Sequence, residues 1–121
     1  MQLSPHFSLS EMTRTSYPYD NSPNEFVKNN LRYVATKLEK IREVHNMPIF
    51  IESGYRSHQV NTVVGGSKTS LHLTGLAVDI RVNNIGYKGM ISFLRAILDT
   101  NPCELHFNSS NVIHIGYNYK H

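Results

Sequence analysis

The apolar positions in the first half of the chain recur with a helical period. Five of them follow one another at spacings of four and three, namely Val27, Leu31, Val34, Leu38 and Ile41. This spacing places them on one face of a helix. We therefore predict a helix over residues 23–44, with Ser22 as its N-cap, Pro23 in its first position and Glu25 completing a capping box.

Two shorter helices are expected on either side. Residues 8–13 begin with the Ser8 and Glu11 spacing of a capping box. A later helix is predicted over residues 88–99, where Asn101 and Pro102 end it. Its inward-facing residues are expected to be Met90, Ile91, Leu94, Ile97 and Leu98.

Four segments are predicted as strands: 49–53, 76–82, 104–107 and 111–117. Residues 14–22 are expected to form a loop, because they are rich in Tyr, Pro, Asp, Asn and Ser. A second, longer polar segment spans residues 54–70, and long ordered loops are often functional. The resulting order of helices and strands predicts an α+β fold with a small antiparallel sheet and flanking helices.

Composition narrows the possible chemistry. The chain has 121 residues, of which 40% are hydrophobic and 17% charged, so we expect one globular domain over residues 1–121. The one cysteine, Cys103, excludes an intramolecular disulfide and a multi-cysteine zinc site. A metal site in this chain would therefore need histidine and carboxylate ligands.

The charge and hydropathy of the chain bear on its partners and location. The net charge of +3 favours an anionic partner, such as a cell-wall polymer or a nucleic acid. We expect no nucleic-acid binding, because the basic residues are scattered without a run of four. No stretch of about 20 apolar residues could cross a membrane. Since residues 1–6 lack the apolar core of a signal peptide, we expect a cytoplasmic monomer that reaches the cell wall only if it is released or exported.

Three metal-capable residues lie in unusual surroundings. Asp79 interrupts an apolar strand, and a buried carboxylate is costly unless it is paired or binds a metal. Alternation along the predicted strands puts Asp79 and His114 on the face opposite their apolar neighbours. If the two strands are adjacent, these side chains can meet, with His72 arriving from the preceding loop. Two histidines and one carboxylate would leave a fourth position open for water, although a lone histidine is also common at the surface or in a core.

The motif around His72 resembles a known family. Ser70-x-His72-x-x-Gly75-x-Ala77-x-Asp79 is similar to the signature of zinc D-Ala-D-Ala carboxypeptidases and related peptidoglycan endopeptidases. The fold of that family also occurs in D-Ala-D-Ala dipeptidases and in the signalling domain of Hedgehog proteins. The resemblance covers nearly the whole chain, because it extends to residues 7–12, 53–57, 60–61, 64–67 and 113–115.

The resemblance implies roles for individual residues. His72, Asp79 and His114 correspond to the zinc ligands of the family. Arg56 corresponds to an arginine that holds the substrate and stabilises the developing oxyanion, which suits a permanently charged guanidinium; a structural salt bridge is the alternative. Ser70 is expected either to bind substrate or to orient His72, and its alternative role is to shape the turn.

The general base departs from the family pattern. Related sequences often carry a glutamate six or seven residues before the last zinc ligand, where this chain has residues 108–111, Asn-Ser-Ser-Asn. The nearest candidates are Glu104 and His106, which share one strand face and could instead be exposed edge-strand residues.

The resemblance implies a zinc metallopeptidase, either a carboxypeptidase or an endopeptidase, that cuts D-Ala-containing stem peptides of peptidoglycan. A phage endolysin made in the host cytoplasm would fit, as would a cytoplasmic dipeptidase or a fragment of a longer secreted protein. Because the expected general-base glutamate is missing at residues 108–111, a second function is also considered. The chain could be a catalytically impaired zinc-binding module that recognises cell-wall peptides or a protein partner, because fold alone does not establish activity.

Overall fold

The helices and strands form an α+β fold around a four-stranded antiparallel sheet. The structure is a computed structural model that describes residues 1–83, 85–108 and 111–119. Its elements, in chain order, are β1 (Gln2–Ser4), β2 (Phe7–Ser8), α1 (Leu9–Thr13), α2 (Glu25–His45), β3 (Phe50–Ser53), α3 (His58–Val63), the 3₁₀ helix η1 (Leu71–Thr74), β4 (Ala77–Arg81), α4 (Gly86–Asp99), β5 (Glu104–Phe107) and β6 (Ile113–Gly116). The predicted fold class is therefore confirmed.

Helix α2 carries the largest share of the core. All five residues of its predicted apolar face are buried. Its start was wrongly predicted, because the helix begins at Glu25 rather than Pro23. Asn24 is the N-cap, and its side-chain oxygen accepts a hydrogen bond from the backbone N–H of Val27 at 2.9 Å. Ser22 instead takes part in a turn, in which its backbone N–H donates to Asp20.

The packed face of helix α4 agrees only in part with the predicted one, because Ile97 is buried and Met90 and Leu94 pack against the core as expected. Its buried residues are Phe93, Ala96 and Ile97, whereas Ile91 and Leu98 are 37% and 58% exposed. Apolar residues surround much of this helix, so the periodicity alone did not select the packed face. The capping box predicted for Ser8 and Glu11 is confirmed at the start of α1.

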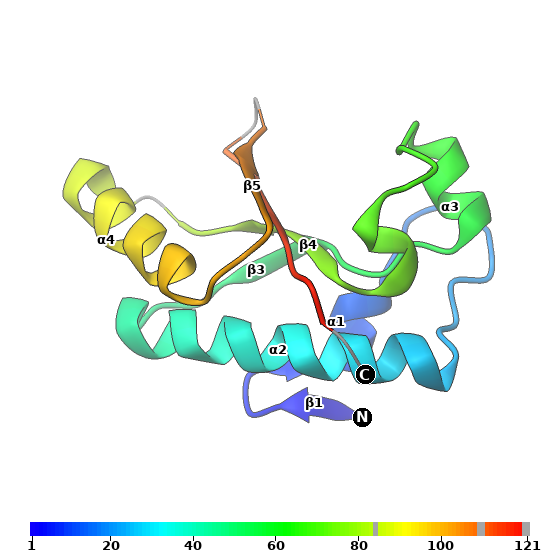
Figure 1. The fold of residues 1–121 in the computed structure, drawn as a ribbon, viewed down its shortest axis with the longest axis horizontal. Helices are drawn as coiled ribbons and strands as arrows, with labels where there is room; N and C mark the ends of the chain where they lie inside the picture. Colours follow the sequence, from blue (N-terminus) through cyan, green and yellow to red (C-terminus); the bar gives the residue numbers. More distant parts are fainter. Residues whose placement is uncertain (84, 109–110, 120–121) are drawn as a thin grey trace.

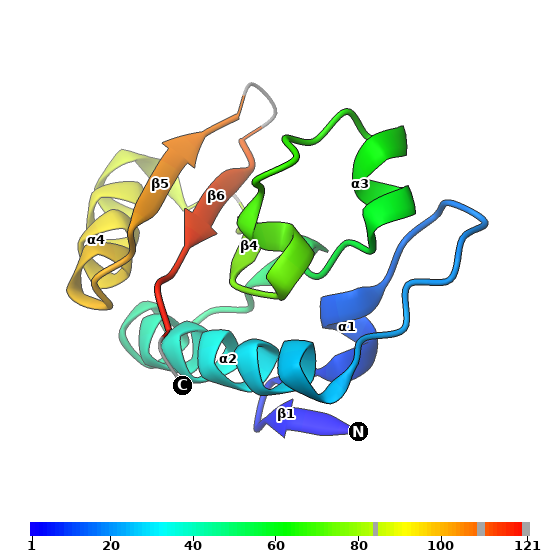
Figure 2. The same cartoon turned by 45° about the vertical axis from the view of Figure 1, so that its right-hand side comes forward.

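The sheet has the strand order β3-β4-β6-β5. Helix α2 runs beneath the sheet, with α4 towards one end and α3 towards the other (Figure 1). Apolar side chains of β4 and β6 face this helical layer and form its core contacts: Val78, Ile80, Ile113 and Ile115. In the rotated view, β5 and β6 lie on one side of β4, and α3 lies on the other (Figure 2).

Four short elements were absent from the sequence-based prediction, namely β1, β2, α3 and η1. The β1–β2 hairpin lies against α2, and α3 forms within the long segment predicted as a loop. Across the described ranges, no helix combines the length and apolar character that crossing a bilayer requires.

The register of the sheet places the predicted site residues on one face. Asp79 on β4 pairs directly with His114 on β6, and His114 pairs in turn with His106 on β5. Residues directly opposite each other in an antiparallel pair project to the same face. The condition for Asp79 and His114 to meet, that β4 and β6 are adjacent strands, is therefore fulfilled.

Candidate metal centre

His72 is held by a single turn of 3₁₀ helix. Ser70 is the N-cap of η1, and its hydroxyl accepts the backbone N–H of His72 at 3.2 Å. Gly75 ends the turn in the left-handed region, with φ of 79°, a conformation that favours glycine. Asn30 of α2 donates to the carbonyl of Thr74 at 2.8 Å and ties the turn to the core. The structure thus gives Ser70 the turn-shaping contact, which orients His72.

The His72 ring is oriented by a backbone carbonyl. Its Nδ1 lies 2.7 Å from the carbonyl oxygen of Gly54, and a carbonyl can only accept, so Nδ1 carries the proton. A Cβ at Gly54 would lie 2.2 Å from the carbonyl oxygen of Met12. Glycine is therefore required for this close approach, and the unprotonated Nε2 of a neutral His72 points towards Asp79.

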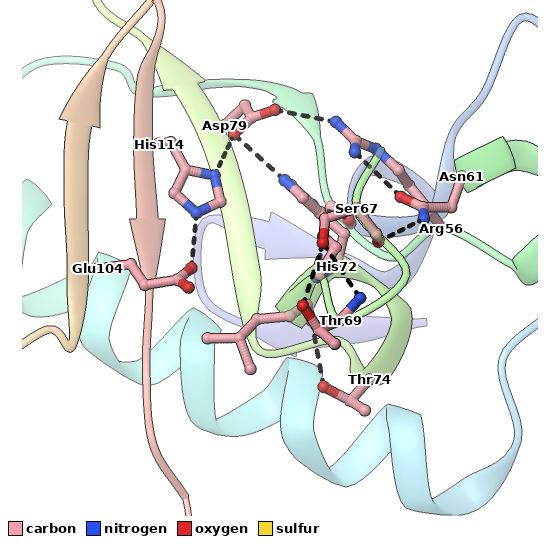
Figure 3. A network of polar contacts seen from close by, with 12 residues as sticks. Arg56, Asn61, Ser67, Thr69, His72, Thr74, Asp79, Glu104 and His114 are labelled. Atoms are coloured by element: carbon pink, nitrogen blue, oxygen red, sulfur yellow. Dashed lines mark hydrogen bonds and ion pairs between the residues drawn. The ribbon is translucent and has the colours of Figure 1, made fainter. Parts of the chain in front are cut away.

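Asp79 lies between the two histidines. Its Oδ1 is 3.2 Å from Nε2 of His72 and 2.8 Å from Nδ1 of His114 (Figure 3). One ligand atom from each of the three residues lies within 4.8 Å of the others, and all three side chains are largely buried. The structure therefore brings together the three predicted ligands from η1, β4 and β6.

Glu104 contacts the outer nitrogen of His114. Its Oε1 accepts a hydrogen bond from Nε2–H of His114 at 2.8 Å. Gly116, opposite Glu104 in the sheet, leaves room for this carboxylate, because a Cβ there would meet Glu104 Oε1 at 2.5 Å. A histidine whose outer N–H is held by a carboxylate has its inner nitrogen free and more basic, which is the usual arrangement around a metal ion.

The electrostatics of the cluster favour a cation at its centre. Each histidine donates one N–H outward, so in its neutral form it turns a lone pair towards the Asp79 carboxylate. Burial opposes ionisation of Asp79, but when the histidines are protonated, the hydrogen bonds that His114 and then His72 donate outweigh it and hold the pKa of Asp79 well below its usual value. The hydrogen bond with Asp79, opposed by burial and aided by Glu104, raises the pKa of His114. A positive charge is stabilised here, and the donor set suits a divalent metal such as zinc.

Arg56 is fixed beside the cluster by three hydrogen bonds. Its Nη2 donates to Oδ2 of Asp79 at 3.2 Å, its Nε to Ser53 at 3.1 Å and its Nη1 to Asn61 at 3.3 Å. Burial lowers the pKa of Arg56, although the Asp79 charge opposes that effect. The salt bridge that was the alternative role of Arg56 is therefore present, and it places the guanidinium next to a candidate metal ligand.

The remaining predicted residue, His106, lies at the rim of the cluster. Its ring stacks on His114 with centroids 4.7 Å apart, and it is exposed on the same sheet face as Glu104. Neither side chain is remote from the centre, so both stay candidates for the proton-transfer role.

Two positioning residues had no role in the sequence analysis. Asn61 is buried, and it binds Arg56 through its side-chain oxygen and the Ser67 carbonyl through its amide nitrogen. Asn21 donates to the Tyr55 carbonyl and accepts the backbone N–H of Ser57, so it holds the segment on both sides of Arg56. The resemblance covered Asn61 but gave it no function, and no local pattern singled out Asn21.

This α+β fold and its cluster of two histidines and one carboxylate define a protein with a candidate metal centre. The chain matches the profile of the family Peptidase M15 over residues 5–116 and belongs to that family. It is thus a member of a peptidase family, as the resemblance implied.

Among solved structures, the chain is similar to the Serratia marcescens L-Ala D-Glu endopeptidase ChiX. The two are 20% identical, with a TM-score of 0.44, and the similarity covers 78% of this chain and 87% of that one. A search of curated protein sequences returned no match.

Proposed function

We propose that this protein is a zinc-dependent peptidase that hydrolyses D-Ala-containing stem peptides of bacterial peptidoglycan, as a carboxypeptidase or an endopeptidase. The convergence of His72, Asp79 and His114 carries the proposal, since three separate segments bring their ligand atoms within 4.8 Å of one another. Membership of the Peptidase M15 family supports the peptidase activity. The substrate class follows from the resemblance of residues 53–57 and 70–79 to the D-Ala-D-Ala peptidases.

Each residue of the cluster offers a defined atom to the metal. His72 offers Nε2, because Gly54 occupies its Nδ1, and His114 offers Nδ1, because Glu104 occupies its Nε2. Asp79 offers Oδ1, which both histidines already face. When bound by such a set, zinc polarises a carbonyl oxygen and lowers the pKa of water in the fourth position.

The neighbouring side chains supply the remaining chemistry. Three of the five N–H groups of Arg56 are engaged, which leaves two to donate to a substrate oxygen as negative charge develops on it. Glu104 is our candidate for the general base that accepts a proton from water and passes it to the leaving amine. Its side chain is 44% exposed and can therefore reach a substrate in the open part of the site. His106, beside it, is the second candidate.

A second function is favoured by one observation. Glu104 is held in a hydrogen bond with His114, and a glutamate that only orients a ligand would not transfer protons. The chain would then be a zinc-binding module that recognises cell-wall peptides or a protein partner without cutting.

Metal analysis and muropeptide digestion together test the proposal. We expect one equivalent of zinc in the wild-type protein and a chelator-sensitive mass loss from purified muropeptides, where the lost mass identifies the bond. His114→Ala should lose both zinc and turnover. His58→Ala removes an exposed histidine outside the cluster and should keep both. Persistent cleavage by His114→Ala would refute the assigned centre.

Glu104→Gln separates the two functions. If Glu104 is the base, this variant retains zinc but loses turnover, since a glutamine cannot accept a proton. If wild-type protein binds zinc and cleaves no muropeptide from several wall types, the binding module is the better conclusion. Monomeric state, cytoplasmic location and phage origin stay predictions.

A further inference from the structure

A pocket lies along the outer edge of the sheet, next to Arg56. Its volume is about 520 Å³, and all four residues of the edge strand β3 line it. The segment after α1, with Arg14 and Tyr17, forms another part of its wall. Because Arg56 lines the pocket and also binds the Asp79 carboxylate, the pocket adjoins the candidate metal centre.

The charged side chains that line the pocket are three arginines and one glutamate: Arg14, Arg56, Arg81 and Glu52. Two of the arginines have acidic partners. Arg81 binds Glu52 at 2.7 Å and lies over the ring of Phe50, and Arg56 binds Asp79. The cationic charge of these two side chains is therefore largely compensated within the protein.

Arg14 differs from the other two. Its side chain is exposed, and its Nη2 donates to the carbonyl oxygen of Ile51 at 3.1 Å. Within the described ranges, no carboxylate forms an ion pair with it. The hydrogen bond to Ile51 anchors the guanidinium on the strand edge, while its other N–H groups stay available to a ligand. A guanidinium held in this way suits a planar carboxylate.

We propose that this pocket is a substrate subsite in which Arg14 binds a free carboxylate of the peptide, away from the bond that is cut. This inference rests on the proposed peptidase function and adds a preference among its substrates. Phe50, Val60 and Tyr17 give the same pocket apolar walls, which would contact the carbon skeleton of the residue that carries the carboxylate. The proposed selectivity is therefore for acidic stem peptides over the same peptides with their internal carboxylates amidated.

A pair of synthetic stem peptides tests this preference in the zinc-loaded protein. One peptide carries free internal carboxylates, the other carries amides at those positions, and both keep a free C-terminus so that Arg56 meets the same group. We expect wild-type kcat/KM to be about twofold to fivefold higher for the acidic peptide, as for one exposed ion pair. Arg14→Gln should remove this preference, while Arg14→Lys should retain part of it.

Two further variants make the comparison specific. Arg95→Gln removes an exposed positive charge on α4, far along the chain from the pocket lining, and should preserve the wild-type preference. Glu52→Gln releases Arg81 from its ion pair and should strengthen the preference. The proposal would be overturned if Arg14→Gln left the ratio of kcat/KM between the two peptides unchanged. It would also be overturned if that ratio were one in the wild-type protein.

Calorimetric titration with the same two peptides separates this inference from the proposed function. If neither peptide is cleaved, the peptidase function fails, but the ratio of the two Kd values still tests Arg14. A Kd ratio that falls to one in Arg14→Gln supports the subsite, and a ratio equal to that of wild type contradicts it. Thermal unfolding of each variant confirms that the compared proteins are folded.

Discussion

Gly116 controls whether Glu104 can reach His114, and Gly116→Ala should therefore weaken metal binding. The added methyl group would lie 2.5 Å from Glu104 Oε1 and 2.9 Å from the Cδ1 atom of Leu71. The Glu104 carboxylate is the far end of a flexible side chain that is 44% exposed, so it is the group that moves. Once it moves, Nε2–H of His114 loses its acceptor and Nδ1 becomes a weaker ligand.

Gly116→Ala should affect zinc affinity and folding stability by separate amounts. Loss of an outer hydrogen-bond partner typically lowers metal affinity about 10- to 100-fold, which corresponds to about 1.4–2.8 kcal/mol. The crowding itself costs about 1–3 kcal/mol. Alanine recovers up to about 1 kcal/mol, because it loses less backbone entropy than glycine on folding. The free energy of unfolding of the metal-free protein should therefore fall by no more than about 3 kcal/mol.

Competition with a chromophoric chelator measures the zinc Kd, and urea denaturation measures folding separately. Glu104→Ala provides the reference, since it removes the same acceptor without crowding. Because both substitutions act through one hydrogen bond, their effects on zinc affinity should not add in the double variant. A Gly116→Ala protein that is folded and binds zinc as tightly as wild type would refute this reasoning, and so would additive effects.

Three further predictions concern stability. The Glu39 carboxylate accepts hydrogen bonds from the hydroxyl of Ser4 and the backbone N–H of His6; burial opposes them, but they lower its pKa. Glu39→Gln should cost about 1–2 kcal/mol at pH 7. The cost should become smaller as the pH falls below 4.5, where the unfolded chain takes up the proton before the folded protein does, and urea titrations would show this. Burial and then Arg42 lower the pKa of His45, so the unfolded chain binds the proton first. Stability should fall as pH drops below 6.5, and less so in His45→Gln. Zinc at 100 times its Kd should stabilise the fold by about 2.7 kcal/mol, and a chelator should lower the Tm accordingly.

The sheet residues of the site could be predicted because strands have a fixed period. Asp79 and His114 each interrupt an apolar alternation, so their common face followed once the strands were taken as neighbours. The face of α4 could not be predicted in the same way. Several of its sides are apolar, and only contact with α2 decides that Phe93 packs inward while Leu98 does not.

The contacts that orient the site residues could not be predicted from the sequence either. The acceptor for His72 Nδ1 is a backbone carbonyl, which every residue possesses, so residue type at position 54 could not reveal it. Asn21 is 36 positions from Ser57, to which it binds, and its role depends on how two loops meet. Similarly, the start of α2 depended on whether Ser22 or Asn24 acted as the cap, and both are good capping residues.

The two histidines use different nitrogens because of where their backbones lie. His114 is directly opposite Asp79 in an antiparallel pair, in which Cα atoms are about 4.5–5.5 Å apart. At this short range the nearer ring atom, Nδ1, meets the carboxylate, and Nε2 continues across β6 towards Glu104 on β5. His72 approaches from η1, outside the sheet, and reaches the same oxygen with the farther Nε2, leaving Nδ1 for Gly54. Exchanging the positions of a histidine and a carboxylate between β4 and β6 would preserve the donor set but lose the Glu104 contact. Asp79→His combined with His114→Asp should therefore bind zinc more weakly than wild type, and equal affinity would show that the outer hydrogen bond contributes nothing.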